Sequence, residues 1–269
     1  MPSSGFVKSE YINQHNHLSI YVIDIKEMSR ELKNKIDEHI LRIWEGRNFY
    51  GTTINDVKLK IKNFLRNKLN ENPEQDSLND IYMGAVAEFF IHIFLNDIGL
   101  EQECTFKNLE ERSIKKGFDG YYSDDAKTWI MESKSGLSTS AGGSHKDKLS
   151  EAYRQLRHKI TTCDENDNNP WENAFNHAKV VDARDSILQQ LKKLSNQFEN
   201  RQINNDIKDF NLIPCSTIFY FEDWDEDREN IISKAKDFAS RRSYSNMIII
   251  CINKLSMNLL INYLEEQNG

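Results

Sequence analysis

The fold is decided by the stretch GFDGYYSDDAKTWIMESK, which is residues 117–134. Two short runs rich in aromatic and β-branched residues, 117–122 and 128–134, flank a polar turn at 123–127. Two such runs around a polar turn predict a β-hairpin. The rest of the chain is placed outward from this hairpin.

The hairpin presents charged side chains on one face. Residues two apart in a strand share a face, so Glu132 and Lys134 point the same way. With a turn centred near residues 124 and 125, Asp119 lies opposite Ile130 and one diagonal step from Glu132, about 7 Å away between Cβ atoms. We therefore expect two carboxylates and one amine in a single small site.

These three groups suit a metal-dependent reaction. Two carboxylates so close raise the pKa of one of them unless a cation lies between them. Mg²⁺ prefers one or two carboxylates, several waters and phosphate oxygens. Beside the ion, Lys134 is expected to orient or deprotonate the attacking water and to offset charge on the phosphate. The pattern predicts phosphodiester hydrolysis; the structural alternative is a surface hairpin with cross-strand ion pairs.

A third carboxylate precedes the hairpin. Glu88 interrupts an otherwise apolar helical pattern, and its small neighbours Gly84 and Ala85 are expected to allow close approach to another element. One interpretation makes Glu88 an auxiliary metal ligand. The other makes it a buried acid paired with a nearby Lys, Arg or His92.

Helical and strand patterns alternate along the rest of the chain. Apolar spacing predicts helices at 28–44, 57–69, 81–96, 146–160 and 180–198, and strands at 18–25, 216–221 and 247–252. This order predicts an α/β fold with a central mixed sheet flanked by helices. We expect a mostly helical N-terminal region, 1–78, packed on a core, 79–269, that ends in additional α/β elements, or else one continuous domain, 1–269.

The ordered landmarks resemble those of the PD-(D/E)xK nuclease superfamily, whose core is like that of restriction endonucleases. They are Ala87-Glu88-Phe89, then Gly117-Phe118-Asp119-Gly120, then Glu132-Ser133-Lys134, and then a helix that contains Gln155. Within this superfamily, residues 80–160 look like the HamA family, the nuclease component of Hachiman anti-phage defence systems. The chain departs from the superfamily's name because Phe118 stands where a proline would precede the aspartate.

The resemblance implies a function in defence. It implies a DNase that depends on Mg²⁺, with Mn²⁺ as a substitute, and that a partner helicase, HamB, restrains until phage infection. By the same resemblance Asp119, Glu132 and Lys134 are catalytic, and Asp119, Glu132 and Glu88 hold the metal.

A basic helix follows the hairpin. We expect it to contact DNA phosphates through five polar or basic side chains: Lys146, Lys148, Arg154, Gln155 and Arg157. The alternative interpretation is a solvated helix face.

Composition excludes several classes of protein. Lys and Arg number 35 and Asp and Glu number 42, a formal charge of −7, which excludes a wholly basic nucleic-acid binder. The longest apolar run, 247–252, is much shorter than the ~20 residues of a membrane span. The N-terminus lacks a signal-peptide pattern, so we expect the cytoplasm. Four dispersed cysteines indicate no thiolate zinc site.

Two other functions stay open at this point. One is a stand-alone restriction-type endonuclease. The other is a non-catalytic member of the same fold that binds nucleic acid or another protein. The catalytic and non-catalytic interpretations differ in whether function requires Glu132 and Lys134.

Overall fold

The computed structural model describes residues 6–70, 80–106, 117–163, 168–202, 205–222, 224, 227–256 and 258–266. Over these residues a seven-stranded sheet runs in the order β1-β2-β7-β6-β5-β4-β3. The strands are β1 (Val7–Asn13), β2 (Leu18–Ile25), β3 (Glu101–Gln102), β4 (Gly120–Ser123), β5 (Thr128–Leu137), β6 (Asn211–Tyr220) and β7 (Asn246–Leu255). The helices are α1 (Arg30–Glu45), α2 (Ile54–Asn70), α3 (Asp80–Asp97), α4 (His145–Thr161), α5 (Pro170–Val180), α6 (Asp185–Glu199), α7 (Arg228–Ser240) and α8 (Leu259–Glu266), with a 3-10 turn, η1, at Ile207–Asp209.

The sheet is mixed. Strands β2, β7, β6 and β5 run parallel to one another, while β1 is antiparallel to β2, and β4 is antiparallel to both β5 and β3. The continuous apolar run of β7 suits a strand buried on both faces. The predicted α/β class with a central mixed sheet is confirmed.

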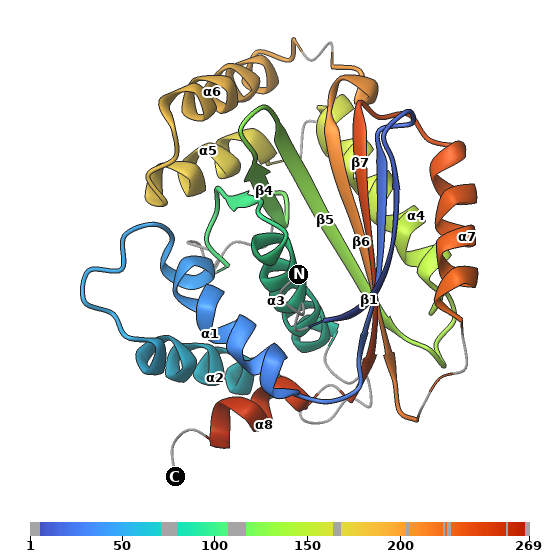
Figure 1. Cartoon of the computed structure of the whole chain (residues 1–269). Coiled ribbons are helices and arrows are strands. Elements are labelled where there is room, and N and C mark those ends of the chain that lie inside the picture. Colours follow the sequence, from blue (N-terminus) through green and yellow to red (C-terminus); the bar gives the residue numbers. More distant parts are fainter. Residues whose placement is uncertain are drawn as a thin grey trace.

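Helices cover both faces of the sheet, so the protein has three layers (Figure 1). One hydrophobic core lies between the sheet and α1, α2, α3 and α8. The second lies between the sheet and α4, α5, α6 and α7. None of the helices in the described ranges combines the length and the apolar character needed to cross a bilayer.

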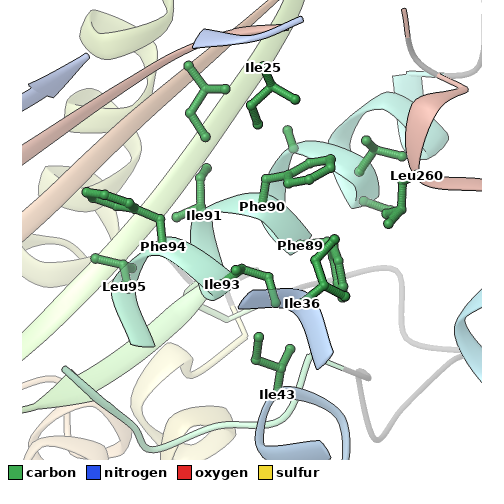
Figure 2. Close-up of a cluster of buried hydrophobic side chains, with 14 of the residues drawn as sticks. Ile25, Ile36, Ile43, Phe89, Phe90, Ile91, Ile93, Phe94, Leu95 and Leu260 are labelled. Atoms are coloured by element: carbon green, nitrogen blue, oxygen red, sulfur yellow. The ribbon is translucent and has the colours of Figure 1, made fainter. Parts of the chain in front are cut away.

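Helix α3 is buried on nearly all sides. Figure 2 shows Phe89 and Phe90 of this helix among Ile25 of β2, Ile36 of α1 and Leu260 of α8. A helix that is apolar all round belongs in a core. This packing fixes the axis of α3, and with it the position of Glu88, which stays partly exposed.

The sequence predictions hold for several elements and fail at others. The predicted strand at 18–25 is β2, and the predicted helix at 81–96 is α3. The helix predicted at 180–198 starts too early, because α5 ends at Val180, and Asp182 adopts a left-handed φ of 56° before α6 begins. Strands β1 and β3 and helix α5 were not predicted, and β6 begins at Asn211, earlier than the predicted start at 216.

The two predicted regions share one sheet. Strands β1 and β2 from 1–78 belong to the same sheet as the strands from 79–269, and β2 pairs with β7. Helices α1 and α2 enclose the same core as α3.

The predicted hairpin is confirmed, but its expected register is wrong. Gly120 pairs with Met131, so Asp119, one residue earlier, faces Glu132 rather than Ile130. The turn is centred later than predicted because Asp124 closes it from its first position. Its carboxylate accepts the backbone N–H groups of Ala126 and Lys127 and the indole N–H of Trp129.

Candidate active site

A pocket of about 690 Å³ opens beside the carboxyl half of β5. Five segments line it: α3, the residue before β4, β5, the loop that follows β5 and α4. The pocket brings together six of the residues singled out from the sequence, namely Glu88, Asp119, Glu132, Lys134, Lys148 and Gln155. The expected catalytic set therefore occupies one place.

Glu132 is the buried centre of the site. Its side chain is 1% exposed, and each carboxylate oxygen meets one lysine. Lys134 Nζ donates to Oε1 at 3.0 Å, and Lys159 Nζ donates to Oε2 at 2.6 Å. Lys134 lies on the same face of β5 as Glu132, as strand alternation predicts. Lys159 comes from the last turn of α4.

Asp119 is held against β5 by the backbone. Its Oδ2 accepts the N–H of Ser133 at 2.9 Å. The next residue, Gly120, is closely packed, since an added Cβ there would lie 2.8 Å from Cε2 of Tyr122 and 2.9 Å from Cε of Met131. The carboxylate of Asp119 is thus fixed beside Glu132 just as the hairpin begins.

The electrostatics of the site follow from burial and from the paired acids. Burial raises the pKa of Glu132, and so does the negative charge of Asp119; Lys159 opposes this more strongly than Lys134. Burial alone would lower the pKa of Lys134, but Glu132 and Asp119 reverse that effect and raise it. Lys134 therefore carries its proton at neutral pH.

The donor set suits a hard cation with few protein ligands. Asp119 and Glu132 supply two carboxylates at one pocket, which is the number that Mg²⁺ takes when waters and phosphate complete its shell. Among the described residues no three His, Cys, Asp or Glu side chains cluster closely enough to hold a metal ion. Glu88 lines the pocket from α3 without forming such a group.

The surroundings of Glu88 differ from those expected. Gly84 does not bring α3 against another element, because a Cβ added there meets nothing within 4 Å. Gly84 lines the pocket instead, and because it has no side chain it leaves the α3 side of the pocket open. His92 is buried and hydrogen-bonds with the hydroxyl of Tyr122.

The five residues expected to contact DNA occupy two faces of α4. Lys148 and Gln155 line the pocket, whereas the exposed side chains of Lys146, Arg154 and Arg157 do not. Helical geometry explains the division, because positions seven apart share a face.

The sequence analysis did not place Lys159 or Glu151 in the site. Both line the pocket, in one helical stripe with Lys148 and Gln155. The sequence contains a signal for Lys159, because it lies four residues after Gln155 and so on the same face of the helix as Gln155 and Lys148.

A comparison with protein-family models finds no match for this chain, and a comparison with curated proteins finds none either. The chemistry of the pocket therefore has to be judged from its own residues.

Proposed function

We propose that this protein is a metal-dependent nuclease that hydrolyses DNA phosphodiester bonds in the pocket beside β5. One observation carries the proposal. The carboxylate of Glu132, 1% exposed, lies beside Asp119 at one pocket and is hydrogen-bonded to Lys134. Burying a charged carboxylate is costly, and this cost is commonly incurred where chemistry needs the charge.

Each of the three residues has a role in this reaction. Asp119 and Glu132 would hold Mg²⁺, or Mn²⁺ in its place, which when bound supplies a Lewis acid that polarises the phosphoryl oxygen. Lys134, protonated at neutral pH, orients the attacking water and balances the charge that develops on the phosphate. Its raised pKa favours this role over that of a general base.

The charge of the pocket supports a need for cations. Its lining contains five carboxylates, from Asp80, Glu88, Asp119, Glu132 and Glu151, and three lysines, Lys134, Lys148 and Lys159. The acids outnumber the lysines by two, so an approaching phosphate meets a net negative surface until cations bind.

The wider role that we propose follows from the sequence resemblance to the HamA family. The nuclease acts as the effector of a bacterial anti-phage defence system, and a partner helicase of the HamB type controls it. A large helicase encoded beside this chain would support this role, and a neighbouring methyltransferase would favour a restriction enzyme instead.

The test is cleavage of supercoiled plasmid by the purified chain in Mg²⁺, with EDTA as the metal-free control. We expect nicking by the wild type, with losses of at least 100-fold in Glu132→Gln and Lys134→Met. Glu38→Gln is the matched control, because Glu38 also pairs with a lysine, at 2.9 Å, but on the exposed face of α1. Inactivity of the folded wild type, alone and with the helicase, would contradict the proposal.

A second candidate is a non-catalytic scaffold. Both oxygens of Glu132 are occupied by lysines, as in a structural ion-pair cluster. A scaffold would keep its DNA or partner binding in EDTA and in Lys134→Met, whereas the nuclease would lose cleavage in both conditions.

A further inference from the structure

Lys159 joins Glu132 to the segment that leads to Asp119. Its ammonium donates to Oε2 of Glu132 at 2.6 Å and to the carbonyl oxygen of Gly117 at 2.9 Å. Gly117 is two residues before Asp119, so this ammonium joins the segment that carries Asp119 to the carboxylate of Glu132. An ion shared by Asp119 and Glu132 would need an oxygen of Glu132, and both oxygens are already hydrogen-bonded to lysines.

Lys159 and a divalent ion would therefore compete for Glu132. A cation bound by Asp119 and Glu132 needs a carboxylate oxygen of Glu132 as a close ligand. The ammonium of Lys159 is already hydrogen-bonded to that carboxylate, so the two positive charges would lie next to each other and repel. The repulsion is strong because Glu132 is almost fully buried and water screens little there.

Lys134 is less able to give way than Lys159. Lys134 extends from the same strand as Glu132, two residues further on. Lys159 reaches the site from a separate helix through a long side chain that passes over the ring of Phe118, with Nζ 5.9 Å from the ring centre. The side chains of Lys159 and Lys134 are 19% and 18% exposed and both line the pocket, so the origin of Lys159 on a separate helix, and not its exposure, sets it apart.

We propose that Lys159 is a positioning residue that holds the metal site closed: its ammonium substitutes for the cation between Glu132 and the Gly117–Asp119 segment and is displaced when the divalent ion binds. The proposal rests on the proposed metal-dependent function. In the metal-free protein the ammonium of Lys159 occupies the site and neutralises negative charge there. The affinity for the metal ion then depends on the cost of displacing this one side chain.

The test compares metal affinity and stability in Lys159→Gln with those of the wild type. We expect isothermal titration with Mg²⁺, and with Mn²⁺ as the tighter probe, to show about tenfold stronger binding in Lys159→Gln, equivalent to about 1.4 kcal/mol. In EDTA the same variant is expected to unfold at a lower temperature, because Asp119 and Glu132 lose a neutralising charge. A loosened site would lower metal affinity, so only relief of competition gives tighter binding together with lower metal-free stability.

Three further variants complete the design. Lys159→Met keeps the apolar stem over Phe118 and serves if the glutamine variant fails to fold. Lys159→Arg keeps the charge and is expected to bind metal within threefold of the wild type. Lys192→Gln, which breaks an exposed ion pair with Glu172 at 3.0 Å away from the pocket, is the matched control.

The outcomes separate this inference from the proposed function. Unchanged or weaker metal binding in both neutral variants, with a wild type that binds metal and cleaves DNA, would overturn the inference alone. A wild type that neither binds Mg²⁺ or Mn²⁺ nor cleaves DNA would overturn both.

Discussion

His145 Nδ1 and Ser216 Oγ lie 2.7 Å apart, and this hydrogen bond ties the first turn of α4 to β6. The other ring nitrogen, Nε2, donates to Oδ1 of Asn253 on β7 at 2.9 Å. Asn253 in turn donates to Asp24 of β2. The helix that carries Lys159 is thus anchored to three parallel strands by buried polar contacts.

We expect His145→Ala to lower the free energy of unfolding by about 2–3 kcal/mol, because it removes the ring that hydrogen-bonds with Oγ of Ser216 and Oδ1 of Asn253 in the buried interior. Urea denaturation followed by circular dichroism measures the change. His158→Ala, at the exposed end of the same helix, is the matched control and is expected to cost less than about 0.5 kcal/mol. Equal losses of unfolding free energy in the two variants would show that the hydrogen bonds of His145 do not stabilise the protein.

A second prediction concerns pH. Burial lowers the pKa of His92 to about 4 from an ordinary value of 6.5. The unfolded chain therefore takes up a proton at a higher pH than the folded protein, so the contribution of His92 is present above pH 6.5 and is lost as the pH falls toward 4. Between pH 7 and pH 5 the loss should be about 2 kcal/mol.

Urea unfolding at the two pH values, in the wild type and in His92→Gln, measures this loss. The variant is expected to show a smaller pH dependence by about that amount, and His158→Gln should keep the wild-type slope because its ring is exposed. If the unfolding free energy of His92→Gln depended on pH as strongly as that of the wild type, groups other than His92 would be responsible for the acid sensitivity.

The two faces of α4 should have different kinetic effects. Lys148→Gln, inside the pocket, is expected to lower kcat about tenfold, which is the loss of roughly 1.4 kcal/mol of transition-state stabilisation. Arg154→Gln and Arg157→Gln, on the exposed face, are expected to raise KM and to reduce the salt dependence of binding while kcat stays within twofold. Plasmid cleavage at several salt concentrations distinguishes these effects, and a reversed pattern would contradict the division of the helix.

Gly84 should control access to the site. A leucine side chain there would project into the open pocket, so Gly84→Leu is expected to reduce cleavage at least tenfold without loss of thermal stability. Gly84→Ala is the control; it should cleave normally and gain up to about 1 kcal/mol of stability, because alanine favours a helix. Normal cleavage by Gly84→Leu would mean that DNA does not pass over α3.

Much of the site could be predicted because strand geometry is regular. Alternation alone placed Glu132 and Lys134 on one face, and the order of the landmarks placed Asp119 and Glu88 near them. The register of the hairpin could not be predicted, because it depends on where Asp124 closes the turn. A single side chain there shifted the partner of Asp119 from Ile130 to Glu132.

Other errors arose where local signals are weak. Strand β1 mixes polar and apolar residues at the edge of the sheet, so its sequence lacks a clear apolar run. Lys159 stood among several basic residues of α4; its helical spacing puts it on the face of Lys148 and Gln155, and the packing of α4 against β5 and β6 turns that face toward the pocket. Helical spacing and three-dimensional contacts, rather than residue type, separate Lys159 from the exposed Arg157.

The pairing of β2 with β7 has a consequence for how the molecule is made. Leu18 lies beside Met247, so two neighbouring strands of the sheet come from opposite ends of the chain. Strand β5, which carries Glu132, pairs with β6, and β6 pairs with β7. During translation the sheet cannot close until β7, residues 246–255, has left the ribosome. The strand that carries the proposed catalytic pair therefore reaches its complete sheet only after β7, far downstream of Glu132, has been added.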